Sequence, residues 1–452
     1  MSVDTVTAPC PPALPPRPVR LSEALPYWFK LGFISFGGPA GQIAMMHQEL
    51  VERRRWISER RFLHALNYCM LLPGPEAIQL AIYLAWLMHG VAGGILAGVL
   101  FFLPAFALLV ALSWIYLAFG TVPAVAGILW GIKPAVVAIV VFAAWRIGSK
   151  ALKNGLLWAF AAAAFVAIFA LDLPFPAIVL AAAAAGALGG RLAPDKFRAG
   201  GGHGAAGKGY GPALIDDDTP PPPHAAFRWI RLGFYAAAGL FLWGAAMLAV
   251  SGTLRDMGGF FTQAALLTFG GAYAVLPYVY QGAVEHYGWL TGPQMIDGLA
   301  LGETTPGPLI MVVTYVGFVG AWTKQVLGPD ALFMAGLAGA TVATFFTFLP
   351  SFLFILAGGP LVEATHGDLK FTAPLTGITA AVVGVILNLA VFFAWHVLWP
   401  QASPAAPFAG GFQWPALAIA VAAFLALWRW KVDVIPVIGA CAALGLAKSL
   451  VP

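Results

Sequence analysis

Two copies of the tripeptide Pro-Gly-Pro interrupt long apolar stretches of this chain. Pro73-Gly74-Pro75 lies inside an apolar stretch that runs from about residue 62 to residue 88, and Pro306-Gly307-Pro308 lies inside another. A proline has no N–H to donate and its ring clashes with the preceding turn, so a continuous helix is not expected there. A half-helix that begins after such a break has unpaired N–H groups and partial positive charge at its first turn. Two such ends that face each other would bind an oxyanion.

Residues near the breaks add to this predicted anion site. Thr304 and Thr305 precede the second break and offer hydroxyl donors, while Gly37-Gly38 and Gly270-Gly271 permit a close approach of the backbone. The alternative interpretation is that both breaks are simple kinks whose free backbone groups are satisfied by neighbouring helices. Because the tripeptide occurs at matching positions of a repeat, described below, we favour the binding site.

Two carboxyl groups lie beside the breaks. Glu76 follows the first break and Glu303 precedes the second. In one interpretation these residues are structural, since a carboxylate is favoured in the first turn of a helix. In the other, an ionisable residue within the membrane is functional and takes up a proton that offsets the charge of an incoming anion. Both residues are therefore candidates for proton coupling.

Basic residues near these elements are candidates for steering an anion towards the site. Arg53, Arg54 and Arg55 lie in a loop with interleaved glutamates, so the alternative is an internally paired surface loop. Lys133 lies about a third of the way along a predicted span, where it either contacts the anion or extends towards the membrane surface.

The composition indicates a helical membrane protein with many spans. The 452 residues are 60% hydrophobic and only 10% charged, whereas a soluble domain has about 25% charged residues. The net charge of +5 resides in loops, where membrane topology explains it, and does not indicate nucleic-acid binding. The cysteines and histidines show no metal-ligand spacing and no catalytic motif is present. We therefore expect no enzyme activity, no cofactor and no metal.

The pattern of apolar segments divides the chain into four parts. We expect a disordered tail at 1–20, a first membrane domain at 21–190, a flexible cytoplasmic linker at 191–226 and a second membrane domain at 227–452. About thirteen spans are predicted, near 26–47, 62–88, 91–118, 122–146, 150–170, 174–190, 227–249, 257–280, 295–320, 331–357, 372–397, 412–430 and 433–450.

An internal repeat relates the two membrane domains. Phe36-Gly37-Gly38 matches Phe269-Gly270-Gly271 at an offset of 233 residues, and the same offset relates the two Pro-Gly-Pro breaks. Further along, Phe102-Leu103-Pro104 matches Phe348-Leu349-Pro350 at an offset of 246. Each repeat would use six spans, and the odd span near 227–249 would invert the second repeat.

The distribution of lysine and arginine fits a cytoplasmic N-terminus with one exception. The loop that contains Arg53 to Arg61 would then lie outside, against the positive-inside rule. Either the first apolar segment does not fully span the membrane, or positive charge is needed outside for function. The sequence leaves both alternatives open.

These motifs together resemble the chromate ion transporter family in its long two-domain form. The first half matches in Phe36-Gly37-Gly38-Pro39, Glu52 to Trp56, Leu72-Pro73-Gly74-Pro75 and Phe102-Leu103-Pro104. The second half matches in Gly302 to Val312 and in Gly317-Phe318 with Gly320-Ala321-Trp322. The resemblance implies an inner-membrane transporter that expels chromate and gives chromate resistance, driven by the proton-motive force or by anion exchange as an antiporter.

Other functions remain as alternatives at this stage. Sulfate is a tetrahedral dianion like chromate and offers the same hydrogen-bond acceptors, so a sulfate or other oxyanion transporter is one alternative. An uncoupled anion channel with the same site is another. The expected partners are the oxyanion, the lipid bilayer of a bacterial inner membrane and, as an open alternative, a second copy in a homodimer.

Overall fold

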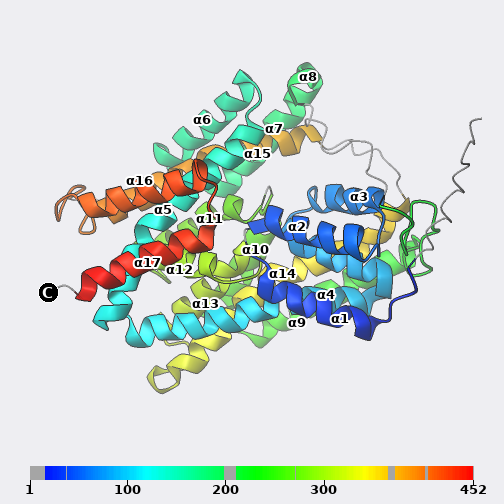
Figure 1. Ribbon diagram of the computed structural model, residues 1–452, viewed down its shortest axis with the longest axis horizontal. Helices are drawn as coiled ribbons and strands as arrows, with labels where there is room; N and C mark the ends of the chain where they lie inside the picture. Colours follow the sequence, from blue (N-terminus) through cyan, green and yellow to red (C-terminus); the bar gives the residue numbers. More distant parts are fainter. Residues whose placement is uncertain are drawn as a thin grey trace, which may run out of the picture.

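Helices form nearly all of the regular structure in the computed structural model (Figure 1). The structure describes residues 16–36, 38–197, 210–269, 271–364, 372–402 and 406–450. Within these ranges, six helices are long and apolar enough to cross a membrane, and four shorter helices are also apolar. The expected class, an all-helical protein that crosses the membrane several times, is confirmed. Most of the predicted N-terminal tail and the middle of the linker lie outside the described residues.

The first membrane domain contains two helix breaks where the sequence predicts them, one between α1 and α2 and one between α3 and α4. The bounds of its helices are α1 Leu21–Ile34, α2 Gly38–His47, η1 Gln48–Arg53, α3 Glu59–Cys69, α4 Glu76–Phe119, α5 Pro123–Ala151, α6 Gly155–Phe169, α7 Phe175–Leu192 and the short α8 Pro194–Phe197.

The second membrane domain begins after one additional helix, α9 Trp229–Ala249. Its other elements are α10 Thr253–Leu266, α11 Ala272–Tyr280, η2 Gln281–His286, α12 Gly292–Thr304, η3 Leu309–Met311, α13 Val312–Thr323, η4 Pro329–Ala331, α14 Leu332–Ala364, α15 Thr372–Leu398, α16 Trp414–Trp428 and α17 Val434–Leu450.

The first pair of half-helices, α1 and α2, folds back on itself. After α2, the chain returns to the first half of α1, where the rings of Tyr27 and Trp56 have centroids 6.0 Å apart. This returning loop also contacts the linker: Ile57 pairs with Ile215 in a parallel β-bridge, and the N–H of Ser58 donates to the carbonyl of Ile215 at 3.0 Å. Figure 1 shows the described part of the linker and the beginning of α1 at the same end of the molecule. We call this end the linker end.

The second pair, α3 and the first arm of α4, returns to the linker end as well. Gly90 has φ 68° and ψ −160°, a conformation that only glycine adopts without strain, and it turns α4 sharply. The two arms then pack closely, since a Cβ built on Gly98 would lie 2.7 Å from Cγ1 of Ile82. The linker covers this turn, with Nε2 of His224 2.8 Å from the carbonyl oxygen of Trp86.

The half-helices of the second domain fold back at the opposite end of the molecule. A Cβ on Gly298 in α12 would lie 2.3 Å from the ring of Tyr315 in α13, so these two helices pack closely and antiparallel. Gln281, which follows α11, accepts a hydrogen bond of 3.1 Å from the N–H of Phe175 at the start of α7. The other end of α7 leads into the linker, and Lys196 there accepts a hydrogen bond from Asn154. The two domains thus present their half-helix pairs to opposite ends.

Four of the predicted spans differ from the structure because each of them contains a pair of half-helices that folds back. The segments near 26–47, 62–88, 257–280 and 295–320 each hold two short helices separated by a break, and neither arm has the length of a full crossing. Hydropathy alone joins the arms because both are apolar.

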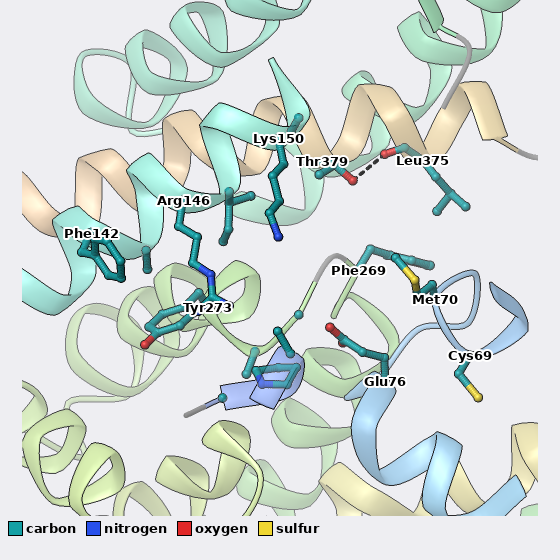
Figure 2. A pocket seen from close by; sticks show the side chains of 18 of the residues that line it. Cys69, Met70, Glu76, Phe142, Arg146, Lys150, Phe269, Tyr273, Leu375 and Thr379 are labelled. Carbon is teal, nitrogen blue, oxygen red and sulfur yellow. Dashed lines mark hydrogen bonds between the residues drawn. The ribbon is translucent and has the colours of Figure 1, made fainter. Parts of the chain in front are cut away.

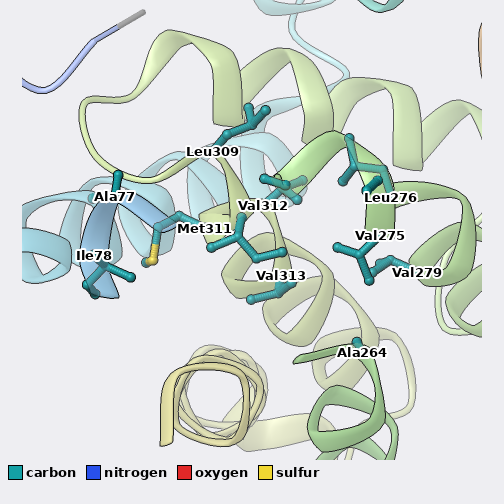
Figure 3. Close-up of a cluster of buried hydrophobic side chains, with 14 of the residues drawn as sticks. Ala77, Ile78, Ala264, Val275, Leu276, Val279, Leu309, Met311, Val312 and Val313 are labelled. Carbon is teal, nitrogen blue, oxygen red and sulfur yellow. The ribbon is translucent and has the colours of Figure 1, made fainter. Parts of the chain in front are cut away.

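The breaks are surrounded by a continuous apolar core. Ala77 and Ile78 at the start of α4 lie beside Met311 and Val312, and Leu276 of α11 completes the contact (Figure 3). All five side chains are at most 2% exposed. This core fixes the half-helices of the two domains against each other, so the breaks occupy defined positions.

Candidate functional site

The two domains exchange a matched pair of hydrogen bonds at their breaks. The N–H of Gly74 donates to the carbonyl of Thr268 at 2.8 Å, and the N–H of Gly307 donates to the carbonyl of Ser35, also at 2.8 Å. Ser35 and Thr268 are related by the same offset of 233 residues as the two glycines. Each Pro-Gly-Pro break is therefore hydrogen-bonded to the residue that precedes the Phe-Gly-Gly sequence of the other domain.

These bonds change the expected list of anion donors. Proline lacks an N–H, and both tripeptide glycines use theirs between the domains, so neither Pro-Gly-Pro sequence itself has an N–H left for a ligand. The hydroxyl of Thr304 donates to the carbonyl of Leu301 at 2.7 Å, and that of Thr305 to Gly302 at 2.8 Å. In this structure, these N–H and hydroxyl groups donate their hydrogens within the protein, and direct binding of the anion by them stays a prediction.

A cavity of about 1330 Å³ lies where the breaks meet. Its lining includes the first turns of three helices: Gly38 of α2, Glu76 of α4, and Ala272 of α11 preceded by Gly271. Each helix start has N–H groups without helical partners and carries partial positive charge. Gly74 also lines the cavity, whereas Pro73, Pro75 and the segment from Thr304 to Pro308 do not belong to its lining. Gly37 and Gly270 lie outside the described residues.

Both candidate carboxyl groups line this cavity. Oε1 of Glu76 would lie 3.5 Å from a Cβ built on Gly271, so this side chain from the first domain faces the break of the second. Glu303 accepts a hydrogen bond of 2.6 Å from the hydroxyl of Tyr273. The structure thus brings together two carboxyl groups that are 227 positions apart in the sequence.

Two cationic side chains of α5 face the carboxyl groups across the cavity. Arg146 extends towards Tyr273, and Lys150, one turn later, points towards the region of Glu76 (Figure 2). Among the described residues, no carboxylate forms an ion pair with either cation. Nearer the linker end the lining contains charges of both signs, namely Lys153, Asp195, Lys196 and Asp433.

The basic residues that the sequence suggested for anion steering lie elsewhere. Arg53 and Arg54 pair with Glu49, with N–O distances of 3.3 and 2.7 Å, and Arg54 also stacks over Trp56. Arg53, Arg54 and Arg55 are not part of the cavity lining. Arg53 and Arg54 are therefore internally paired with a glutamate of their own loop, which was the alternative interpretation.

Lys133 pairs with a residue that sequence reasoning overlooked. Its Nζ lies 3.3 Å from Oδ2 of Asp297 in α12, and the hydroxyl of Tyr116 donates to the same oxygen at 3.0 Å. Asp297 is 3% exposed. Asp297 lies within an apolar segment, where an ionisable residue is a candidate for a functional role. The sequence alone could therefore have pointed to it. Arg146 and Lys150 had no comparable signal because cations at the end of a span are explained by topology alone.

A comparison with known families identifies the family of this chain. The family model described as "Chromate transporter" matches residues 23–187 and 255–446, which is more than half of the chain. The chain belongs to the chromate transporter family. The interval between the two matched regions, residues 188–254, contains the whole of the predicted linker and α9.

Curated relatives cover most of the chain. The "Chromate transport protein" of Pseudomonas aeruginosa is 33% identical over 453 residues, covering 97% of this chain and 94% of the relative. That of Cupriavidus metallidurans is 30% identical over 379 residues, covering 83% and 82%. The "Probable chromate transport protein" of Synechococcus elongatus is 29% identical over 376 residues, covering 82% and 84%. No solved structure matches this member of the chromate transporter family significantly.

Proposed function

We propose that this protein transports chromate or a closely related tetrahedral oxyanion across the membrane, with the anion held in the cavity at the breaks. The observation that carries this proposal is the lining of the cavity. Three helix starts, contributed by both domains, face it together with Arg146 and Lys150, and such a combination of N–H groups and cations suits a dianion. The three relatives named above, described as chromate transport proteins or a probable chromate transport protein, support chromate as the substrate.

The membrane topology that we propose has two inverted repeats. The half-helix pairs of the first domain enter from the linker end and those of the second from the opposite end, with α9 as the odd crossing between them. In this arrangement, the loop with Arg53 to Arg61 lies on the linker side together with Arg146 and Lys196. This loop then no longer conflicts with the positive-inside rule, and the excess of lysine and arginine on the linker side favours a cytoplasmic linker in an inner-membrane protein.

Proton coupling would solve an electrostatic problem in the cavity. A dianion that binds near Glu76 and Glu303 is repelled by both carboxylates unless they take up protons. Transport of the anion would then be linked to proton movement at Glu76 and Glu303, and the proton-motive force could drive efflux.

The alternatives differ in their support. Sulfate fits the same chemistry because N–H and cationic donors recognise charge and acceptor geometry shared by both dianions. A channel is less well supported because the opposite end is packed: the rings of Phe392 and Tyr280 have centroids 4.3 Å apart, and Lys133 is paired with Asp297.

Chromate uptake into everted inner-membrane vesicles tests the proposal. Uptake should depend on the protein, saturate, respond to an imposed pH gradient and fall when sulfate is added. Vesicles from cells that lack the protein provide the background. Saturable uptake that ignores the gradient would favour anion exchange, non-saturating flux would favour a channel, and no uptake by correctly inserted protein would refute chromate as the substrate.

A further inference from the structure

The cationic wall formed by Arg146 and Lys150 has no equivalent in the other repeat. At the offset of 246 residues that relates the later helices of the two domains, Arg146 corresponds to Phe392 and Lys150 to His396. The two pairs lie on equivalent helices, α5 and α15, but at opposite ends of the molecule. At the far end, Phe392 packs against His396 with ring centroids 4.0 Å apart, and Nε2 of His396 would lie 3.2 Å from a Cβ on Gly292.

Lys133 lies in the half of α5 nearer the far end, and a carboxylate already pairs with it. Lys133 corresponds by the same offset to Thr379, which lines the cavity. The Nζ of Lys133 is 3.3 Å from Oδ2 of Asp297, and the side chain of Asp297 is 5% exposed. This buried carboxylate offsets the charge of Lys133, so the pair offers an approaching anion little net attraction.

We propose that Arg146 and Lys150 contact the transported oxyanion directly and make the linker face the high-affinity face of the transporter. The inference rests on the proposed function and deepens it by assigning residues to substrate binding. When the cavity opens at the linker end, a tetrahedral dianion meets two cations spaced one helical turn apart on α5. When the inverted repeat opens the other end, the equivalent wall presents Phe392 and His396 and holds the anion less tightly.

This asymmetry suits a protein that collects an anion on one side and releases it on the other. Side-chain geometry supports a direct contact, because Arg146 and Lys150 both extend into the cavity towards the breaks (Figure 2). An arginine can bind two oxygens of one oxyanion at once, while a lysine acts as a point charge. The arginine is therefore expected to contribute more to affinity.

The test measures the half-saturating chromate concentration on each face of the membrane, using everted and right-side-out vesicles. The wild-type protein should saturate at a lower concentration when the linker face is outermost. Arg146→Gln should raise the half-saturating chromate concentration at the linker face about tenfold or more, because it removes one charge-assisted hydrogen bond. The half-saturating concentration at the other face should stay unchanged. Lys150→Gln should act in the same direction, and Arg146→Lys should recover part of the affinity.

Arg191→Gln is the matched control, since Arg191 is an exposed arginine at the end of α7 that does not line the cavity. An unchanged half-saturation at the opposite face shows that a variant is folded and inserted. Equal half-saturation at both faces of the wild-type protein would overturn the inference, as would an unaltered linker-face value in Arg146→Gln and Lys150→Gln. A wild-type protein without any chromate flux would instead refute the proposed function itself.

Discussion

The Nζ of Lys133 and the Oδ2 of Asp297 lie 3.3 Å apart and join α5 of the first domain to α12 of the second. The hydroxyl of Tyr116 donates to the same carboxylate oxygen at 3.0 Å. At the linker end a comparable cluster joins the domains: the guanidinium of Arg61 lies 3.3 Å from Glu363 in α14, and Tyr83 also donates to Glu363. Each half-helix pair next to a Pro-Gly-Pro break is thus held to the other domain by a carboxylate, a cation and a tyrosine.

Removing one partner of the Lys133–Asp297 pair should destabilise the protein. Lys133→Met leaves a buried carboxylate without its cation, and breaking such a pair costs on the order of 3 kcal/mol. The double variant Lys133→Met with Asp297→Leu removes both charges and should be closer to wild type than the single variant. Thermal unfolding of the purified protein in detergent measures the difference.

Arg53→Met is the control for this comparison because Arg53 forms an exposed ion pair with Glu49, and its side chain is 65% exposed. Exposed pairs contribute at most about 1 kcal/mol. If the single Lys133 variant were as stable as the Arg53 variant, the pair would not hold the domains together in the way that its burial suggests.

The glycines of the two Pro-Gly-Pro breaks should not tolerate a side chain. Gly74 and Gly307 have φ values of 122° and 110°, a region that costs other residues about 1 kcal/mol or more. A Cβ on Gly74 would also lie 2.6 Å from Oγ of Ser351, and one on Gly307 would lie 2.7 Å from Cβ of Ala105. We expect Gly74→Ala and Gly307→Ala to insert into the membrane but to lose most transport.

The control for the glycine variants is Gly244→Ala in α9, where a Cβ would meet no atom within 4 Å. It should transport like the wild-type protein. Vesicle uptake normalised to the amount of inserted protein separates loss of function from loss of expression. Normal uptake by both break variants would mean that the crossing of the breaks is not needed for transport.

The positions of the helix breaks could be predicted from the sequence, whereas the hydrogen-bond partners of the break residues could not. Proline and glycine interrupt a helix through their own backbone properties, so the breaks at Gly74 and Gly307 could be located without a structure. Which backbone group accepts their N–H bonds depends on the other domain, and no local pattern reveals Ser35 or Thr268 as partners. The position of Arg146 in the cavity lining could not be predicted either, because the sequence pattern of a cation at the end of a span is the same whether the side chain faces water or a cavity.

Cysteine labelling should distinguish the proposed topology from one in which every predicted span crosses the membrane. In a background with its native cysteines replaced, Arg53→Cys and Asp217→Cys should react with an impermeant reagent from the same side, because their loop and the linker are in contact. His286→Cys, at the exposed last residue of η2, should react only from the other side. Opposite labelling of positions 53 and 217 would refute the folded-back arrangement of the first half-helices.

Replacing Glu76 by glutamine should change how transport responds to pH on the linker side. If the anion binds only when this carboxyl is protonated, the half-saturating chromate concentration of the wild-type protein falls as the pH on that side falls. Glutamine is neutral at every pH, so Glu76→Gln should bind chromate with a weaker dependence on pH, and the remaining dependence would report Glu303. The other charged groups deep in the same cavity are the cations Arg146 and Lys150. Glu23→Gln is the matched control, because Glu23 pairs with Arg17 at the start of α1 and its side chain is 41% exposed. An identical pH profile in the Glu76 variant and the control would assign Glu76 a structural role at the start of α4, where the helix dipole favours its charge.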